Sequence, residues 1–345
     1  MKGEGIIGAA DTVTKAYIRK NEVFADAFNY FMYDGRQKIQ PEQLRELDST
    51  EIAILLNEKD TKDKTNKEKE ASEQKMVQKY RDLLKTATIM EDGEATYVLL
   101  GIENQTEVHY AMPVRNMLYD AMQYNQQVTE IAEKHKGKKG GKRQQKISTG
   151  EFLSGFYKNN KLIPVITLVL FFNPGEWDGP RSLFDMLDIS NPIFKKYAQD
   201  YKIHIISPKE ILESDLKKFS SSLREVIGCI KYSNDKNKLA AFIQDNPRMN
   251  IEVEAARVLE VITHTHIKRE EVDDMGNVNM CKAIQEMYDD GVKDGIQKGV
   301  ERGIAAVIRT CRNLNVSEED TLNNVQREYE LSMEEAKKYL ETYWK

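Results

Sequence analysis

Apolar residues recur at helical spacing near the start of the chain and predict the first helix. Residues 12–33 form one such segment, in which the apolar side consists of Phe24, Phe28, Phe31 and Met32. Asp26 lies off this side of the predicted helix. The stretch at 57–75 is almost wholly charged and polar, which predicts an insertion or a flexible loop.

The pattern of the middle of the chain predicts a helix followed by two strands. Residues 112–134 are amphipathic with a helical period, and the predicted apolar side consists of Met117, Leu118, Ala121 and Tyr124. The apolar run at 161–172 is typical of a buried strand, and 201–208 predicts a second, weaker strand. Together with a hairpin before residue 112, this order predicts an α/β or α+β fold for residues 1–215.

The remainder of the chain has helical spacing, and we expect two further regions there. The spacing predicts a helical region over 216–290. Over 291–345 it predicts a glycine-periodic helix followed by two short helices. Ser332 and Glu335 form a capping box at the start of the last of these. In the periodic helix a glycine recurs every fourth residue, followed each time by Val or Ile; these are Gly291, Gly295, Gly299 and Gly303. The segment is either an exposed linker or a close-packing seam for a homo-oligomer through 291–304.

Composition and cysteine spacing argue against a zinc site and a membrane protein. The chain has 345 residues, a formal net charge of −5 and three cysteines without Cys-x-x-Cys spacing. The cysteines predict reduced thiols and no zinc site, and we expect structural roles for His264 and His266. No apolar run is long enough to span a membrane, and the first residues show no signal peptide.

A local basic segment departs from the acidic average. Residues 134–147 include Lys138, Lys139, Lys142 and Arg143 and contain no acidic residue. Such a patch favours contact with nucleic-acid phosphates, although its Gly-Lys composition is equally typical of a flexible, solvated loop.

The apolar strand before residue 103 ends in polar groups, and a turn signal predicts what lies opposite them. Asp92-Gly93 is typical of a two-residue hairpin turn, which makes Glu91 face Glu94. Counting outward, Asp82 faces Glu103 on the neighbouring strand. Gln105 lies two positions beyond Glu103 and therefore shares its face of the sheet.

Two opposed carboxylates suggest a metal site. Like charges directly opposite each other destabilise a sheet, whereas a hard divalent cation turns their repulsion into binding. Mg²⁺ favours one or two carboxylates together with waters and phosphate oxygens, so Asp82 and Glu103 are candidate ligands of Mg²⁺ or Mn²⁺. The alternative is that Asp82 belongs to an ion pair and that Glu103 and Gln105 are ordinary polar residues at a strand end.

Three stretches carry a resemblance to a known family. "KYRDLLK", "YVLLGIENQTEVHYAMPVRNMLYDAMQY" and "IPVITLVLFFNPGEWDGPRSLFDMLD" resemble the Rpn family of recombination-promoting nucleases, also described as putative transposases, within the PD-(D/E)XK nuclease superfamily. The resemblance covers roughly residues 20–210. It implies a restriction-endonuclease-like core with a central mixed sheet flanked by helices. In that pattern Asp82 matches the motif aspartate, and Glu103 and Gln105 match the Glu-x-Lys/Gln pair.

The resemblance also suggests further site residues. Many superfamily enzymes carry an acid on the first helix, for which Asp26 is the candidate catalytic residue and Glu22 the alternative. Arg115 and Tyr119, one turn apart on the next helix, are candidates for DNA binding, with Arg115 on a phosphate; they are equally interpretable as a packing pair. For Trp177 we expect packing of its loop against the core, and stacking on a base is the alternative.

The function implied is that of a Mg²⁺-dependent endonuclease acting on double-stranded DNA in the bacterial cytosol or nucleoid, linked to recombination or mobile elements. Gln105 stands where the superfamily usually has lysine, although members of the Rpn family carry glutamine too. An amide orients a water but supplies no charge. A catalytically inactive DNA-binding or oligomeric regulatory protein on the same fold is therefore the alternative, and a purely structural protein organised by the glycine-periodic helix is a third possibility.

Overall fold

The computed structural model describes residues 4–47, 82–91, 94–137, 147–244, 246–263 and 272–344. These residues divide into two compact units, Met1–Asn279 and Met280–Lys345, which are described separately below. The expected insertion at 57–75, the basic residues Lys138, Lys139, Lys142 and Arg143, and the histidines at 264 and 266 lie outside the described residues. No described helix combines the length and the apolar character needed to cross a membrane.

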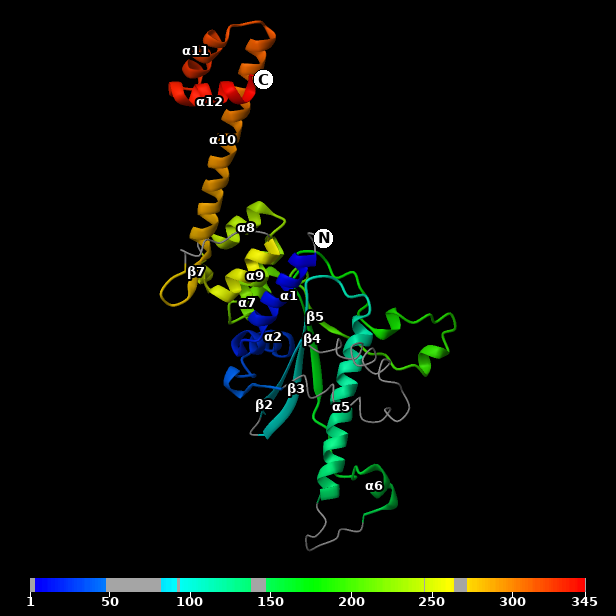
Figure 1. Cartoon of the computed structure of the whole chain (residues 1–345). Helices are drawn as coiled ribbons and strands as arrows, with labels where there is room; N and C mark the ends of the chain where they lie inside the picture. The colour runs from blue at the N-terminus through cyan, green and yellow to red at the C-terminus, as the bar shows by residue number, and fades with distance from the viewer. Residues whose placement is uncertain are drawn as a thin grey trace, which may run out of the picture. The chain divides into compact units, whose positions relative to one another are not determined.

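A five-stranded mixed sheet forms the centre of the first unit (Figure 1). Its strands, in spatial order, are β1 (Arg45–Glu46), β2 (Leu83–Glu91), β3 (Glu94–Gln105), β4 (Val165–Phe171) and β5 (His204–Ile206). The β1–β2 and β2–β3 pairs are antiparallel, whereas β3–β4 and β4–β5 are parallel. The prediction of a mixed α/β architecture, with a buried strand within 161–172 and a second, weaker strand within 201–208, is confirmed.

The predicted register of the β2–β3 hairpin is confirmed along its described length. Glu91 pairs with Glu94 at the turn end, and Leu83 pairs with Ile102 at the other end. Asp92 and Gly93 themselves lie outside the described residues. Since no bulge interrupts the ladder, Asp82 directly precedes the partner of Ile102 and lies beside Glu103.

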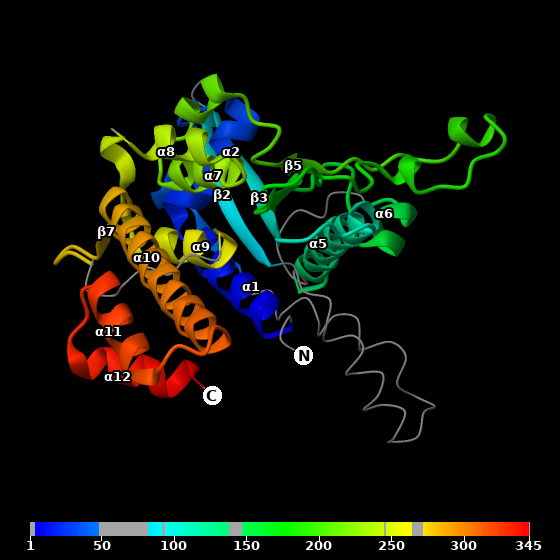
Figure 2. The same cartoon turned by 90° about the horizontal axis from the view of Figure 1, so that it is seen from above.

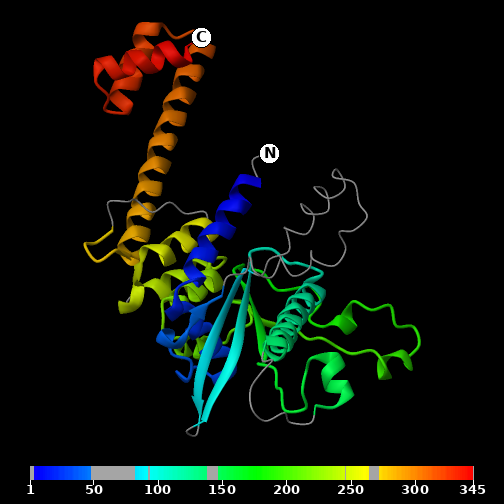
Figure 3. The ribbon, with the colours of Figure 1, turned by 60° about the horizontal axis from the view of Figure 1, so that its bottom comes forward.

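Helices cover both faces of this sheet (Figure 3). Successive side chains of a strand point to opposite faces. On β3, Asn104 donates a hydrogen bond to Thr14 of α1 (Glu4–Ile18), while Glu103 forms an ion pair with Arg115 of α5 (Met112–Gly137). Therefore α1 packs on one face of the sheet near the end of β3, and α5 packs on the other.

The prediction of one continuous helix over 12–33 is wrong. The chain forms α1 and α2 (Asn21–Tyr33), with Lys20 in an extended conformation between them. Lys85 of β2, which is 1% exposed, donates hydrogen bonds of 2.5 and 2.6 Å to the carbonyl of Arg19 and the side chain of Asn21. A buried ammonium from another element thus satisfies polar groups at the interruption, a contact that helical periodicity cannot reveal.

The prediction of which side of 112–134 faces the protein is only partly confirmed. Tyr124 packs against the core, but Ala121 and Leu118 are exposed, and the most buried side of α5 includes several polar residues. It consists of Met112, Asn116, Tyr119, Asp120 and Gln123. Hydrogen bonds make this possible, because Asp120 accepts from Thr167 of β4 and from Tyr201, each at 2.6 Å.

Several shorter helices complete the first unit on the α1 side of the sheet (Figure 2). They include α7 (Leu223–Tyr232), α8 (Lys236–Ile243) and α9 (Val253–Thr263), and α6 (Thr149–Ser154) follows α5. The region after Pro208 is mainly helical, as predicted, but β6 (Asn250–Glu252) and β7 (Asn277–Asn279) add an antiparallel pair that the sequence pattern did not indicate.

The second unit contains three helices. The long α10 (Met280–Asn313) includes the glycine-periodic segment, and α11 (Glu318–Glu328) and α12 (Met333–Tyr343) follow it. The predicted capping box of Ser332 and Glu335 is present. Ile304, Ile308 and Val325 form the buried centre of this unit, so only the C-terminal part of α10 packs on the two short helices.

Candidate active site

Asp82 lies immediately before β2 and its side chain is 6% exposed. One carboxylate oxygen accepts the backbone N–H of Asn104 at 2.8 Å, which ties it to the neighbouring strand. The other oxygen lies 2.9 Å from the ammonium of Lys15 on α1. Lys15 also lies 2.7 Å from Asp11, one turn earlier on the same helix. Burial alone would lower the pKa of Lys15, but its hydrogen bonds to Asp11 and Asp82 raise it.

Glu103 is fully buried near the end of β3 and is approached from the other face of the sheet. One of its carboxylate oxygens lies 3.1 Å from the guanidinium of Arg115 on α5. Burial would lower the pKa of Arg115, but the nearby charges of Glu103 and Asp82 contribute to raising it. Two of the predicted site residues, Glu103 and Arg115, are therefore in direct contact, and the charge of Asp82 also acts on the guanidinium.

Tyr119 belongs to the same cluster. The Nε of Arg115 lies 3.3 Å from its hydroxyl, and the guanidinium lies 5.7 Å from the centre of its ring. Burial, and next the charge of Glu103, raise the pKa of Tyr119. The structure thus shows the packing interaction between Arg115 and Tyr119 that was one of the two interpretations of their spacing.

Gln105 is the last residue of β3 and is half-buried. Its backbone carbonyl accepts the N–H of Phe172, which extends the pairing of β3 with β4. Alternation along the strand places its side chain on the same face as Glu103. The amide is therefore on the α5 side of the strand end.

The structure does not bring Asp26 into this cluster. Asp26 is buried on α2, and its carboxylate accepts four hydrogen bonds from the backbone N–H groups and hydroxyls of Ser220 and Ser221. The alternative acid, Glu22, is exposed on the first turn of the same helix. The acid of the first helix that is connected to Asp82 is instead Asp11, because Lys15 contacts both carboxylates.

The donor set fits a hard divalent cation in its chemistry. Asp82 and Glu103 offer carboxylate oxygens from adjacent strands, and two carboxylates supplemented by waters and phosphate oxygens are a normal magnesium ligand set. Within the described ranges no group of three or more His, Cys, Asp or Glu side chains could form a cage made of protein ligands alone. The donor chemistry therefore fits an open site that substrate oxygens complete, while the present partners of the two carboxylates come from opposite faces of the sheet, Lys15 from α1 and Arg115 from α5.

Sequence reasoning missed several polar residues around the cluster. Lys15 lies on the turn after Asp11, but no spacing in the sequence connects it to Asp82. Asn116 is fully buried next to Arg115, and neither its amide nitrogen nor its amide oxygen has a hydrogen-bond partner in the described part of the chain. Nothing in the local sequence indicated that Asn116 is buried, because it lies off the side of the helix that the apolar pattern predicted to be buried.

Trp177 packs the loop after β4 against the core, as expected. It is buried and makes an edge-to-face contact with Phe171, with ring centres 5.2 Å apart. Met112 and Val169 belong to the same apolar cluster. The indole therefore supports the loop beside the end of β4 and is not presented to a base.

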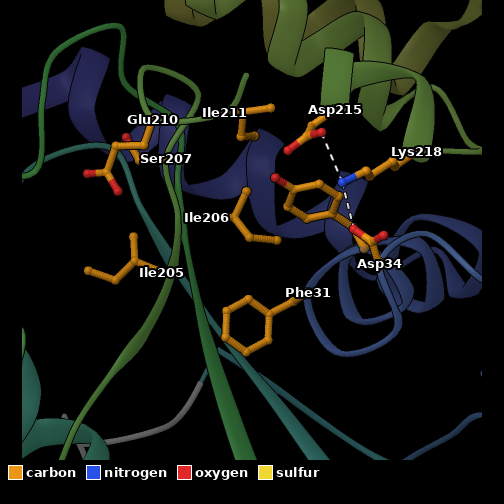
Figure 4. Close-up of a pocket in the computed structure, with 10 residues that line it drawn as sticks. Phe31, Asp34, Ile205, Ile206, Ser207, Glu210, Ile211, Asp215 and Lys218 are labelled. Atoms are coloured by element: carbon orange, nitrogen blue, oxygen red, sulfur yellow. Dashed lines mark ion pairs between the residues drawn. The ribbon is translucent and has the colours of Figure 1, made fainter. Parts of the chain in front are cut away.

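A separate cavity of about 350 Å³ lies beside β5 (Figure 4). Its walls combine apolar side chains from α2 and β5 with an ion-pair chain in which Lys218 lies between Asp34 and Asp215, at 2.6 and 2.9 Å. Phe31 and Ile206 form part of its apolar lining. None of the residues expected at the carboxylate site lines this cavity.

Comparison of the chain with protein-family models, with curated proteins and with solved structures gives no match.

Proposed function

We propose that this chain is a metal-dependent DNA endonuclease that hydrolyses phosphodiester bonds. The observation that carries the proposal is the register of β2–β3, which brings Asp82 and Glu103 to the adjoining ends of paired strands, with the guanidinium of Arg115 3.1 Å from Glu103. The sequence resemblance to the Rpn nucleases supports the same assignment. The hairpin β2–β3 within a mixed sheet, with helices on both faces, supports a restriction-endonuclease-like core.

Each residue of the cluster has a distinct role in this proposal. Asp82 and Glu103 would hold Mg²⁺ or Mn²⁺. The bound ion would activate a water and stabilise charge on the phosphate under attack. Gln105 would orient that water through its amide, and Arg115 would contact a phosphate oxygen. Burial of the two carboxylates strengthens every charge interaction in the cluster.

The partner in this proposal is double-stranded DNA, in the bacterial cytosol and nucleoid. The basic residues Lys138, Lys139, Lys142 and Arg143 would follow the DNA backbone without reading its sequence. A homo-oligomer through 291–304 remains a prediction. Val292, Ile296 and Val300 are exposed there, and a Cβ on Gly295 would meet no atom within 4 Å.

Cleavage of supercoiled plasmid in Mg²⁺ tests the assignment. We expect the wild type to nick or linearise the plasmid and Asp82→Asn to lose this activity while remaining folded by circular dichroism. Asp188→Asn, which changes an exposed carboxylate on the loop after β4, is the matched control and should cut like the wild type. If Asp82→Asn cleaves at the wild-type rate, the proposed metal site is wrong.

One observation favours a second candidate function, that of a DNA-binding or regulatory protein that does not cut. Asp82 and Glu103 each form an ion pair with a side chain of the protein, so their charge is compensated without a metal. Such a protein would bind DNA in the plasmid assay but leave it intact at every Mg²⁺ or Mn²⁺ concentration.

A further inference from the structure

The two candidate metal ligands are each paired with a cation that comes from a different face of the sheet. Lys15 reaches Asp82 from α1, and Arg115 reaches Glu103 from α5. Both cations are more exposed than their partners: the side chains of Lys15 and Arg115 are 38% and 29% exposed, against 6% and 0% for the carboxylates. The cations therefore have room to move toward solvent, whereas the carboxylates are fixed in the protein.

Formal charges show what these pairs do to ion binding. The two carboxylates are balanced by the two cations, and Asp11, 2.7 Å from Lys15, leaves the cluster with one negative charge. A divalent cation added alone would reverse this to one positive charge and would repel both Lys15 and Arg115. One phosphodiester, which carries a single negative charge, would return the cluster to neutrality. Because charges interact strongly away from water, the neutral state with both the metal ion and the phosphodiester is more favourable than the positively charged state with the metal ion alone.

We propose that Lys15 and Arg115 act as tethered counterions that compete with a divalent metal ion for Asp82 and Glu103, so that the metal ion and a DNA phosphate bind cooperatively. This inference rests on the proposed function, because it concerns the regulation of the same site. Once displaced, an ammonium and a guanidinium are suited to binding phosphate oxygens. The metal-free chain keeps its buried carboxylates compensated, and the site becomes complete only on DNA.

Cooperativity of this kind is reciprocal. If DNA tightens metal binding by some factor, the metal must tighten DNA binding by the same factor. Coupling between two sites typically amounts to about 5- to 150-fold in affinity. Removing one tethered cation should raise the affinity for the metal alone, because a competitor is lost, and should reduce the coupling factor.

The test uses the full-length chain and Ca²⁺ as the divalent probe in binding measurements. Isothermal titration gives the Ca²⁺ affinity without DNA, and fluorescence anisotropy of a short duplex gives the DNA affinity with and without Ca²⁺. We expect Ca²⁺ to tighten DNA binding by the wild type at least about 5-fold. In Lys15→Met and Arg115→Met, Ca²⁺ alone should bind several-fold more tightly and the coupling factor should fall toward one.

A matched control separates competition from a general change of charge. Lys20 has a similar exposure, 34%, but it pairs with Glu252 and Glu254 at 3.8 and 2.9 Å. Lys20→Met should therefore leave the Ca²⁺ affinity and the coupling factor unchanged. Lys15→Gln, which keeps a polar side chain on α1, replaces Lys15→Met if circular dichroism shows that the methionine variant is misfolded.

The outcomes distinguish this inference from the proposed function. If the wild type cuts plasmid in Mg²⁺ but the Lys15 and Arg115 variants bind Ca²⁺ no more tightly and keep the full coupling factor, the cations are structural and the inference is wrong. If the wild type neither binds Ca²⁺ nor cuts DNA in Mg²⁺ or Mn²⁺, the proposed function fails, and the inference fails with it.

Discussion

Asp26 was a candidate catalytic acid on the first helix, but its contacts predict a structural role that stability measurements can test. Its carboxylate accepts hydrogen bonds of 2.9 Å from the backbone N–H groups of both Ser220 and Ser221, and from their hydroxyls at 2.9 and 2.6 Å. Arg248 donates to the carbonyls of the same two serines. Asp26 and Arg248 therefore hold the segment before α7 through its N–H groups and its carbonyls, respectively.

The expected loss follows from the bonds that cannot be replaced. In Asp26→Ala the two serine hydroxyls can turn toward water, but the two backbone N–H groups remain where they are. A hydrogen bond to a charged group contributes about 1.5–3 kcal/mol, and Ser220 is exposed enough for water to compensate part of this. We therefore expect Asp26→Ala to lower the free energy of unfolding by about 2–4 kcal/mol. Asp26→Asn keeps one acceptor oxygen and should lose about half as much.

Urea denaturation followed by circular dichroism measures these changes, and Glu22→Ala on the exposed side of the same helix is the matched control. Glu22→Ala should change the free energy of unfolding by less than about 0.5 kcal/mol. Where Asp26→Asn remains folded, its plasmid cleavage per folded molecule should equal that of the wild type. A variant that is as stable as the wild type but does not cut would refute this reasoning and restore Asp26 as a catalytic residue.

Three further predictions concern other parts of the molecule. Burial raises the pKa of Glu225 from 4.5 to about 7 against the opposing charges of Arg248 and Arg224, so the protonated form stabilises the folded state below pH 4.5 and that stability is lost as the pH rises through 7. Between pH 5 and 8 the unfolding temperature should therefore fall less steeply with pH for Glu225→Gln than for the wild type. Equal slopes for the two proteins would contradict this. Gln105→Ala should lower single-turnover cleavage by about 10²–10³-fold with DNA affinity in Ca²⁺ nearly intact, whereas equal rates would make the residue structural. Gly295→Ala should stabilise α10 by about 1 kcal/mol, but the same change at Gly303 should lose that gain because its Cβ would lie 2.5 Å from the Tyr329 hydroxyl; calorimetry of both variants checks the difference.

The candidate site shows which features of the structure can be predicted from local sequence patterns and which cannot. Alternation and the Asp92-Gly93 turn signal were enough to predict that Asp82 lies beside Glu103, because an uninterrupted hairpin fixes every pair once its turn is known. The same reasoning could not find Lys15, because α1 packs on the sheet from a position about 70 residues earlier in the chain. Helical periodicity also could not show that α5 buries its polar side, since Asp120 is compensated by Thr167 and Tyr201.

The sequence by itself therefore determined the order of the main elements, the register of β2–β3 and the pairing of the two carboxylates. All of these depend on interactions between residues that are close in the chain or joined by one tight turn. Only the tertiary structure decided where the first helix breaks, where Asp26 binds and which cations compensate Asp82 and Glu103. Those outcomes depend on buried polar groups finding partners far away in sequence, such as Lys85 at the carbonyl of Arg19 and Ser220 at Asp26. A polar group must be hydrogen-bonded when it is buried, but its residue type does not specify which distant group will satisfy it.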